Sequence, residues 1–131
     1  MQELDWLLAN LQANVEGVMS SVVLSADGLA LGKTPGLTEE DAEHLAALAA
    51  GAFSLARGTG ARFGCGEVNQ AIIEMEQSLL MISPAGGGAC LALIAEATAD
   101  AGLIAYEMSV LVKRVGRHMV ANPRFPVSGM I

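Results

Sequence analysis

Two histidines have the widest chemical range of any side chains in this sequence, because imidazole serves as a general base or a metal ligand near neutral pH. His44 and His118 fall in different predicted helices, on sides that we expect to face solvent. Neither has a carboxylate at a spacing that forms a catalytic dyad. The GxSxG elbow, the HExxH helix and the CxxC pair do not occur. We therefore interpret both histidines as surface residues and predict that the protein is not an enzyme.

The two cysteines are the next candidates, as metal ligands or redox-active thiols. Cys65 and Cys90 have neither metal-binding spacing nor a third ligand. Glu3 and Asp5 interrupt the first turns of the chain, so no basic segment followed by an apolar one marks a secretion signal. We therefore expect a cytoplasmic protein whose two thiols are reduced and structural, with no metal site.

Two glycine-rich stretches invite comparison with phosphate-binding loops. Gly58, Gly60 and Gly64 follow a predicted helix and precede a strand, which is the reverse of the order that a dinucleotide-binding loop requires. Residues 86–88 are three consecutive glycines, but the lysine of a GxxxxGK[ST] loop is missing. Helix capping and tight turns account for both stretches, so we expect no bound cofactor.

Clustered charges offer two further alternatives. An acidic cluster consists of Glu39, Glu40, Asp41 and Glu43. Its carboxylates could ligate a divalent ion, but their place at the start of a predicted helix is explained more simply by the helix dipole. Arg57 and Arg62 flank the glycine-rich loop, and either could act as an arginine finger toward a nucleotide held by a partner. A solvated cation at a helix C-terminus is the ordinary case, and we favour it here.

Length and composition limit the class of protein. The chain has 131 residues, of which 53% are hydrophobic and 16% charged, so we expect one folded domain with much buried surface. A formal net charge of −7, with only seven Lys and Arg, argues against nucleic acid as a partner. No apolar run approaches the ~18 residues of a membrane span, so we expect no membrane insertion. We assign one domain to residues 3–122 and a mobile tail to residues 123–131.

The predicted elements follow the order helix, hairpin, helix, three-stranded meander, helix. The strongest signal is Asp27-Gly28 between two apolar runs, which predicts a β-hairpin. The meander is predicted over residues 68–75, 78–84 and 89–95. Asp100 caps the last helix. The predicted fold class is α+β: a five-stranded antiparallel sheet with the middle helix on one face and the terminal helices on the other.

The middle helix has an unusual composition. Thr38 caps it, and it is predicted to end near Arg57, where Gly58 and Gly60 supply a C-terminal cap. Its sheet-facing side is predicted to comprise Leu45, Leu48, Ala49, Ala52, Phe53 and Ala56. A second stripe with almost no bulk comprises Ala47, Gly51 and Ser54. Small side chains let another helix approach closely, so we favour a partner helix there; the alternative is that Ala is simply a good helix former.

Residues 68–75 are predicted to form an edge strand. Asn69, Gln70 and Glu74 interrupt its apolar residues, whereas the next two strands are nearly continuously apolar. An uncovered edge must be blunted or paired. This strand contains Ile72 and Ile73, no proline, and a single internal charge near its end. We therefore predict that it pairs with a second copy of the chain.

Four segments together resemble the bacterial branch of the Roadblock/dynein light chain superfamily. They are LDWLLANLQANVEGVMSSVVLSADGLALG, TEEDAEHLAALAAGAFSLA, the meander and AGLIAYEMSVLVKRVG, and they span residues 3–122. The resemblance implies a homodimer in which the edge strands pair into one continuous sheet, with the two middle helices side by side above it. The dimer-interface residues are then Val68, Asn69, Gln70, Ala71, Ile72, Ile73 and Gly51.

The resemblance also implies a function. Bacterial members bind small Ras-like GTPases of the gliding-motility type, some stimulate GTP hydrolysis, and they have no nucleotide site of their own. The dimer docks through the middle-helix surface and reshapes the GTPase without inserting an arginine finger. The matching positions here, assigned by helix position, are Glu40, Glu43, Ala47 and Ser54. Two alternatives stay open: a passive scaffold that leaves nucleotide turnover unchanged, and a ligand-sensing module, for which no convergent polar groups mark a pocket.

Overall fold

A computed structural model describes residues 3–121 of the chain, with side chains through residue 118. Its elements in chain order are α1 (Glu3–Asn14), β1 (Val18–Leu24), β2 (Ala30–Lys33), α2 (Glu39–Arg62), β3 (Ala71–Glu74), β4 (Ser78–Gly86), β5 (Ala89–Glu96) and α3 (Ala101–Ala121). This is the predicted order of elements. The predicted mobile tail, residues 123–131, lies outside the described residues.

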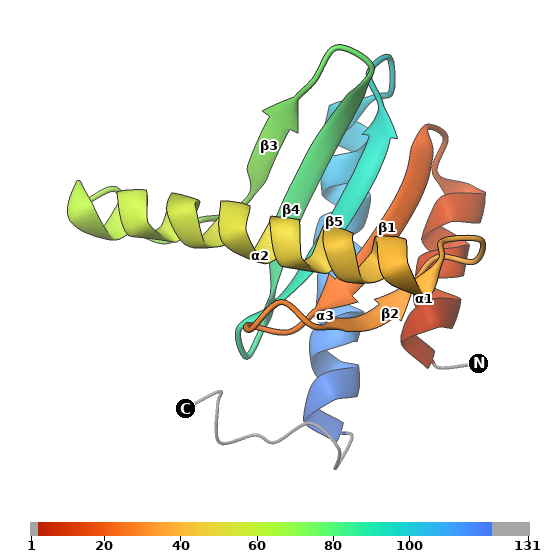
Figure 1. Ribbon diagram of the computed structural model, residues 1–131, viewed down its shortest axis with the longest axis horizontal. Coiled ribbons are helices and arrows are strands. Elements are labelled where there is room, and N and C mark those ends of the chain that lie inside the picture. The colour runs from red at the N-terminus through yellow and green to blue at the C-terminus, as the bar shows by residue number, and fades with distance from the viewer. Residues whose placement is uncertain (1–2, 122–131) are drawn as a thin grey trace.

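The five strands form one antiparallel sheet with the order β2-β1-β5-β4-β3. Helix α2 crosses one face of this sheet, and α1 and α3 cover the other face (Figure 1). The predicted fold class is confirmed, including the division of the helices between the two faces. Strand β3 lies at one edge of the sheet and β2 at the other.

The core consists of two layers separated by the sheet. Along β5, Leu91 and Leu93 belong to the layer under α1 and α3, whereas Cys90 and Ala92 belong to the layer under α2. Successive side chains of a strand point to opposite faces, so a strand covered on both faces must be apolar throughout. The continuous apolar run of this strand in the sequence follows from its central position.

The β1–β2 hairpin forms at the predicted turn. Gly28 has φ +83°, a left-handed conformation that a residue without Cβ adopts freely. Its N–H donates to the carbonyl of Ser25 over 3.0 Å, and the Ser25 N–H donates to the carbonyl of Leu29 over 2.9 Å. The local sequence is sufficient for this turn, because all of its hydrogen bonds join residues within four positions of each other.

Helix α2 begins as predicted but ends later. The Asp41 N–H donates to Thr38 Oγ1 over 3.1 Å, which confirms the cap. The predicted end near Arg57 is wrong, because the helix continues to Arg62. Neither Gly58 nor Gly60 has a positive φ; the chain turns at Gly64 instead. Each of the two glycines lowers the stability of the helix by only about 1 kcal/mol relative to alanine, which is too little to end it.

Gly60 has a different role from the predicted cap. A Cβ at this position would collide with the carbonyl oxygen of Gly66, because the chain folds back against the last turns of α2. The Cys65 N–H donates to the Gly60 carbonyl over 2.8 Å in this backfold. The missing side chain therefore allows a close approach of backbone to backbone, inside the helix rather than after it.

Helix α3 begins with its predicted cap, since the Leu103 N–H donates to Asp100 Oδ1 over 3.0 Å. No helix of the described part of the chain is long and apolar enough to cross a membrane.

Candidate protein-interaction surface

Helix α2 faces the sheet with small side chains. Ala42, Ala46 and Ala49 are fully buried against the strands, and Leu45 and Phe53 complete the contact. The prediction that Leu48 also faces the sheet is wrong, because 68% of its surface is exposed. Successive side chains of a helix are rotated by about 100° around its axis. Leu48 directly precedes the buried Ala49, so its side chain points to the flank of the helix and not to the sheet. The buried face is therefore narrower than the apolar pattern indicates.

The predicted GTPase-binding residues lie together on the outer side of α2. Glu40, Glu43, Ala47 and Ser54 are all exposed, as is Gly51 from the predicted dimer interface. Their spacing of three or four residues aligns them in one stripe. No atom lies within 4 Å of the position that a Gly51 Cβ would occupy. Nothing inside the chain therefore requires a glycine there.

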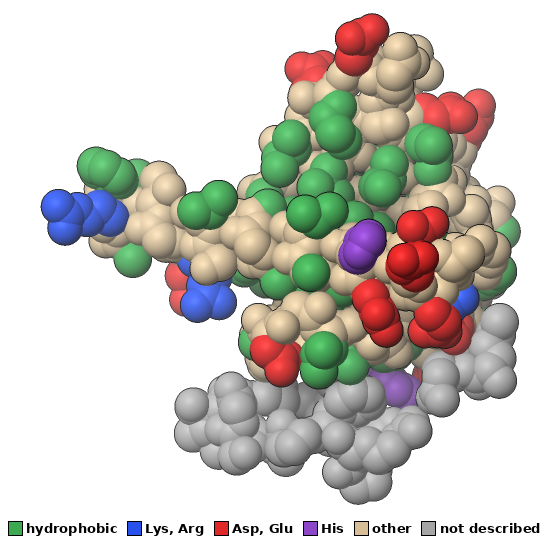
Figure 2. Space-filling model, viewed as in Figure 1, with side chains coloured by type: hydrophobic (Ala, Val, Ile, Leu, Met, Phe, Trp, Pro, Cys, Tyr) green, Lys and Arg blue, Asp and Glu red, His purple; other side chains and the backbone are tan. Residues whose placement is uncertain are grey.

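Two leucines beside this stripe were missed as surface residues. Leu48 and Leu55 are 68% and 76% exposed, and together with the stripe they make the outer side of α2 largely apolar in its middle. Figure 2 shows acidic side chains gathered at the N-terminal end of α2 and cationic ones at its C-terminal end. The sequence carried a signal for the pair, because two leucines seven residues apart return to the same side of a helix.

Strand β3 is an edge strand, as predicted, but a shorter one. It spans Ala71–Glu74 rather than residues 68–75 and pairs with β4 alone. Ile72 and Ile73 are 52% and 42% exposed on its two faces. Large apolar side chains on an unpaired edge are typical of a strand that pairs with another chain.

The residues just before β3 form a connector rather than a strand. Val68 packs against the core layer under α2. The Gln70 side chain donates from Nε2 to Ser83 Oγ on β4 over 3.1 Å. Asn69 between them is exposed. Three of the predicted interface residues therefore precede the edge strand, and two of them make contacts inside their own chain.

The last turns of α2 project past the β3 edge of the sheet (Figure 1). We refer to residues 57–63 as the α2 arm. Phe63, at its end, is 73% exposed, and its N–H donates to the Thr59 carbonyl over 3.0 Å. The arm and the open strand thus lie on the same side of the molecule.

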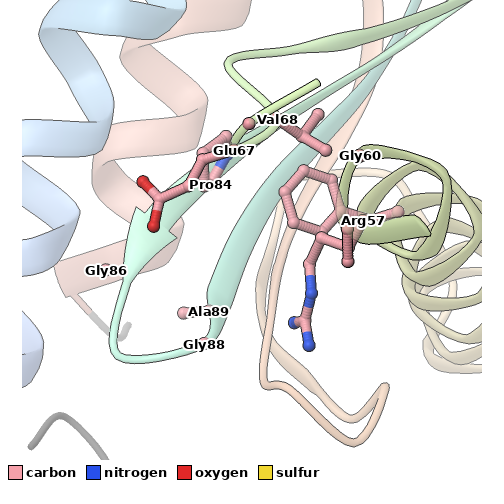
Figure 3. A pocket seen from close by; sticks show the side chains of 11 residues that line it. Arg57, Gly60, Glu67, Val68, Pro84, Gly86, Gly88 and Ala89 are labelled. Carbon is pink, nitrogen blue, oxygen red and sulfur yellow. The ribbon is translucent and has the colours of Figure 1, made fainter. Parts of the chain in front are cut away.

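A cavity of about 550 Å³ lies between the α2 arm, the connector and the β4–β5 turn (Figure 3). Phe53, Val68, Pro84 and several glycines supply most of its walls. Its two charged residues, Arg57 and Glu67, extend in different directions, and no ion pair joins them in the described part of the chain. The cavity has apolar walls but no converging set of polar groups for catalysis.

The two thiols are free and occupy different environments, Cys65 exposed and Cys90 buried. Burial raises the pKa of Cys90 from 9.0 to about 11, against a smaller lowering by the nearby Arg57 charge. This thiol stays protonated at neutral pH, which makes it a poor nucleophile. No group of three His, Cys, Asp or Glu side chains within residues 3–121 could hold a metal ion.

The prediction for His118 is wrong. Its side chain is only 15% exposed, and its Nδ1 lies 3.2 Å from Glu3 Oε2 at the start of α1. The two residues are 115 positions apart, so sequence spacing could not reveal the pair. His44 is exposed on α2, as predicted.

Comparison with known proteins identifies the family. Residues 4–95 match the model of the Roadblock/LC7 domain. An uncharacterized protein of Methanocaldococcus jannaschii is 34% identical over 101 residues, which cover 76% of this chain and 86% of that protein. The chain belongs to the Roadblock/LC7 family.

Solved structures agree with this assignment. A Roadblock/LC7 domain from Streptomyces avermitilis superposes with a TM-score of 0.87 at 44% identity, over 92% of this chain and all of that one. MglB of Myxococcus xanthus superposes with a TM-score of 0.82 at 15% identity, over 93% of this chain and 98% of that one. The second likeness is one of fold.

Proposed function

We propose that this chain is a homodimeric, non-enzymatic regulator that binds a small Ras-like GTPase and changes its GTP hydrolysis or nucleotide state. The observation that carries the proposal is the adjacency of two unpaired features, the open β3 edge and the exposed outer side of α2. Membership of the Roadblock/LC7 family and the likeness in fold to MglB support it. We expect the protein in the cytoplasm, where such GTPases act.

The first step is pairing of β3 with β3 of a second copy. A two-fold axis beside the strand would continue the sheet and satisfy the free backbone groups of both edges. Ile72 and Ile73 would then lose much of their exposed surface. An isologous interface doubles the effect of each such residue, because it occurs twice.

The second step is contact between the two α2 helices. Because the α2 arm extends past β3, it would lie over the partner's half of the continued sheet. Gly51 has no side chain and borders open space, so the flank of a second α2 helix could approach closely beside it, which leaves Ala47 and Ser54 available to the GTPase. The exposed Leu55 beside Gly51 adds apolar surface to bury.

The GTPase would bind across the outer side of the paired helices. Glu40 and Glu43 supply negative charge at the N-terminal end of α2, so the matching surface of the GTPase should be basic. Arg57, at the start of the α2 arm, extends along the cavity beside the β4–β5 turn, whereas Arg62 is exposed at the end of α2. The position of Arg57 supports regulation by reshaping the GTPase over its use as an arginine finger.

The test is co-purification with a Ras-like GTPase encoded by a neighbouring gene, loaded with GDP or a GTP analogue, followed by hydrolysis and exchange assays. The double variant Glu40→Lys/Glu43→Lys should weaken binding by about tenfold or more, because it reverses the charge of the docking surface. The matched control is Glu16→Lys/Glu76→Lys, which reverses the same number of charges at exposed sites outside α2. Equal loss of binding in both variants would contradict the proposal.

The contribution of arginine needs its own measurement. Arg57→Ala/Arg62→Ala should leave the effect on GTP hydrolysis intact. A complete loss of stimulation with binding preserved would instead assign the chain a finger mechanism. Binding without any change in hydrolysis or exchange would favour the alternative, a passive scaffold.

A further inference from the structure

Helix α3 has an exposed apolar stripe on the face of the molecule opposite α2. Leu103, Tyr106 and Val110 are 49%, 62% and 43% exposed. Their spacing of three and four residues places them on one side of the helix, away from the buried side that holds Ile104 and Met108. Nothing in the described part of the chain covers this stripe.

The C-terminal half of the same stripe is cationic. Lys113, Arg114 and Arg117 are three of the seven Lys and Arg residues in a chain with a net charge of −7. Trp6 of α1, 49% exposed, extends the apolar surface sideways, and the Arg114 guanidinium carbon lies 5.8 Å from the centre of its ring. The helix dipole explains cations near this end, but it does not explain the apolar half.

The opposite end of this face is acidic. Asp100 caps α3, and Glu96 ends β5 just before it; both residues are exposed. The face therefore carries negative charge at one end, apolar side chains in the middle and positive charge at the other end. A surface with this order of charges is complementary to itself when a second copy is turned antiparallel.

The register of such a pair follows from the apolar stripe. An antiparallel pair centred midway between Leu103 and Val110 sets these two residues opposite each other. The same register sets Lys113 opposite Asp100 of the partner subunit, and it brings Arg117 toward the acidic end of the partner's face. Antiparallel helices also align their dipoles favourably.

We propose that the outer face of α3 is a second self-association surface that binds another copy of this chain in this antiparallel arrangement. It lies on the other side of the sheet from α2, so it is compatible with the dimer proposed above and does not require it. Two different two-fold contacts on one subunit generate a closed tetramer or an open chain of subunits. An anionic membrane fits this face less well, because Glu96 and Asp100 would face like charges.

The experiment compares molar mass in solution for the full chain and its variants by light scattering and sedimentation. At high micromolar concentration the mass of wild type should be at least twice that of Tyr106→Glu, because the substitution places a charge in the centre of the apolar stripe and removes the α3 contact. Leu29→Glu is the matched control, since Leu29 is 61% exposed in the β1–β2 turn, away from α3. An identical mass for wild type and Tyr106→Glu would overturn the proposal.

Charge reversal tests the register. Lys113→Glu should weaken the association by roughly tenfold, because the reversal occurs twice in a symmetric pair. Adding Asp100→Asn should restore part of it, because Asn keeps the helix cap but removes the charge opposite residue 113. A double variant that associates more weakly than Lys113→Glu alone would overturn the antiparallel register. Vesicle binding that requires Tyr106, with no change in mass, would overturn self-association in favour of a membrane.

The two self-association surfaces can be separated. Ile72→Asp should remove only the β3 contact, and Tyr106→Glu only the α3 contact. If Tyr106→Glu lowers the mass and Ile72→Asp does not, the α3 proposal holds and the β3 dimer fails. The reverse result rejects the α3 proposal and leaves the dimer in place.

Discussion

The chain covers the β2 edge of the sheet and leaves the β3 edge uncovered. On the β2 edge, the Lys33 N–H donates to Asp5 Oδ1 of α1 over 2.8 Å. The Lys33 ammonium donates to the Leu37 carbonyl over 2.6 Å. Gly32 lies so close to α1 that a Cβ there would be 2.8 Å from the Leu4 Cβ. This edge is closed by the chain itself.

The β3 edge has no such cover. Ile72 and Ile73 stay exposed, and no hydrogen bond from elsewhere in residues 3–121 reaches the outer side of the strand. A free edge invites aggregation, so proteins normally protect the edges that they do not use. Protection of one edge and exposure of the other within the same small domain supports the proposal that β3 pairs with a second copy of the chain.

The largest effect should come from a charge on the open edge. Ile72→Asp is expected to raise the dimer dissociation constant by at least about a thousandfold, because two carboxylates lose water and two apolar contacts disappear. Sedimentation equilibrium measures this shift. The unfolding midpoint of the monomer should change little, since half of the Ile72 surface is already exposed. A dimer that survives the substitution would place the interface elsewhere.

A substitution on the closed β2 edge should lower the stability of the chain instead of weakening its association. Gly32→Ala is expected to lower the free energy of unfolding by about 1–3 kcal/mol, because the new methyl group must push α1 away from β2. Urea unfolding measures the change. Gly58→Ala is the control: its site is open space on α2 and should gain about 1 kcal/mol from helix propensity. A neutral Gly32→Ala would mean that α1 is not held against the edge.

Cys90 on the central strand β5 can report how substitutions at either edge affect the opening of the core. Burial raises the pKa of Cys90 to about 11, so folding favours its protonated thiol. That contribution is complete below pH 9 and is lost as pH rises from 9 to 11, by an amount on the order of 3 kcal/mol. In a Cys65→Ser background, alkaline unfolding curves and thiol labelling measure it. Gly32→Ala should speed labelling of Cys90, and Ile72→Asp should not.

The smallest expected effect is at Gly51 on α2, where substitutions should separate the stability of the monomer from the affinity of the dimer. Gly51→Ala should raise the stability of the monomer by about 0.5–1 kcal/mol, because the site is open and alanine favours the helix. Gly51→Leu should stabilise the isolated chain similarly but weaken the dimer, since its bulk would separate the two helices. Thermal unfolding and sedimentation measure the two quantities. Equal dimer affinity for both variants would remove Gly51 from the interface.

Much of the fold follows from local sequence. The Asp27-Gly28 turn and the caps at Thr38 and Asp100 form where the sequence predicts them, because each uses hydrogen bonds between residues a few positions apart. The exposed stripe of Glu40, Ala47 and Ser54 was likewise predictable, since helical periodicity alone sets which residues share a face.

Contacts between distant elements decided the rest. Gly60 was predicted to end α2, but it lies within the helix, where its missing side chain makes room for the carbonyl oxygen of Gly66. The Gln70 side chain bonds to Ser83, so the connector reaches β3 three residues later than its β-propensity indicates. The pairing of Glu3 with His118 joins the two ends of the described chain. Gln70 and Ser83 are 13 positions apart and Glu3 and His118 are 115 apart, so no local pattern reveals either pair.

The amino-acid sequence by itself determined the order of elements, the helix caps at Thr38 and Asp100 and the Asp27-Gly28 turn, because these depend on periodicity and short-range hydrogen bonds. Only the tertiary structure decided that β2 is sealed while β3 stays open. That difference rests on Asp5 reaching Lys33 across 28 positions and on the close packing of Gly32 against Leu4. Burial and long-range hydrogen bonding exist only once the layers have assembled, and no local pattern encodes them.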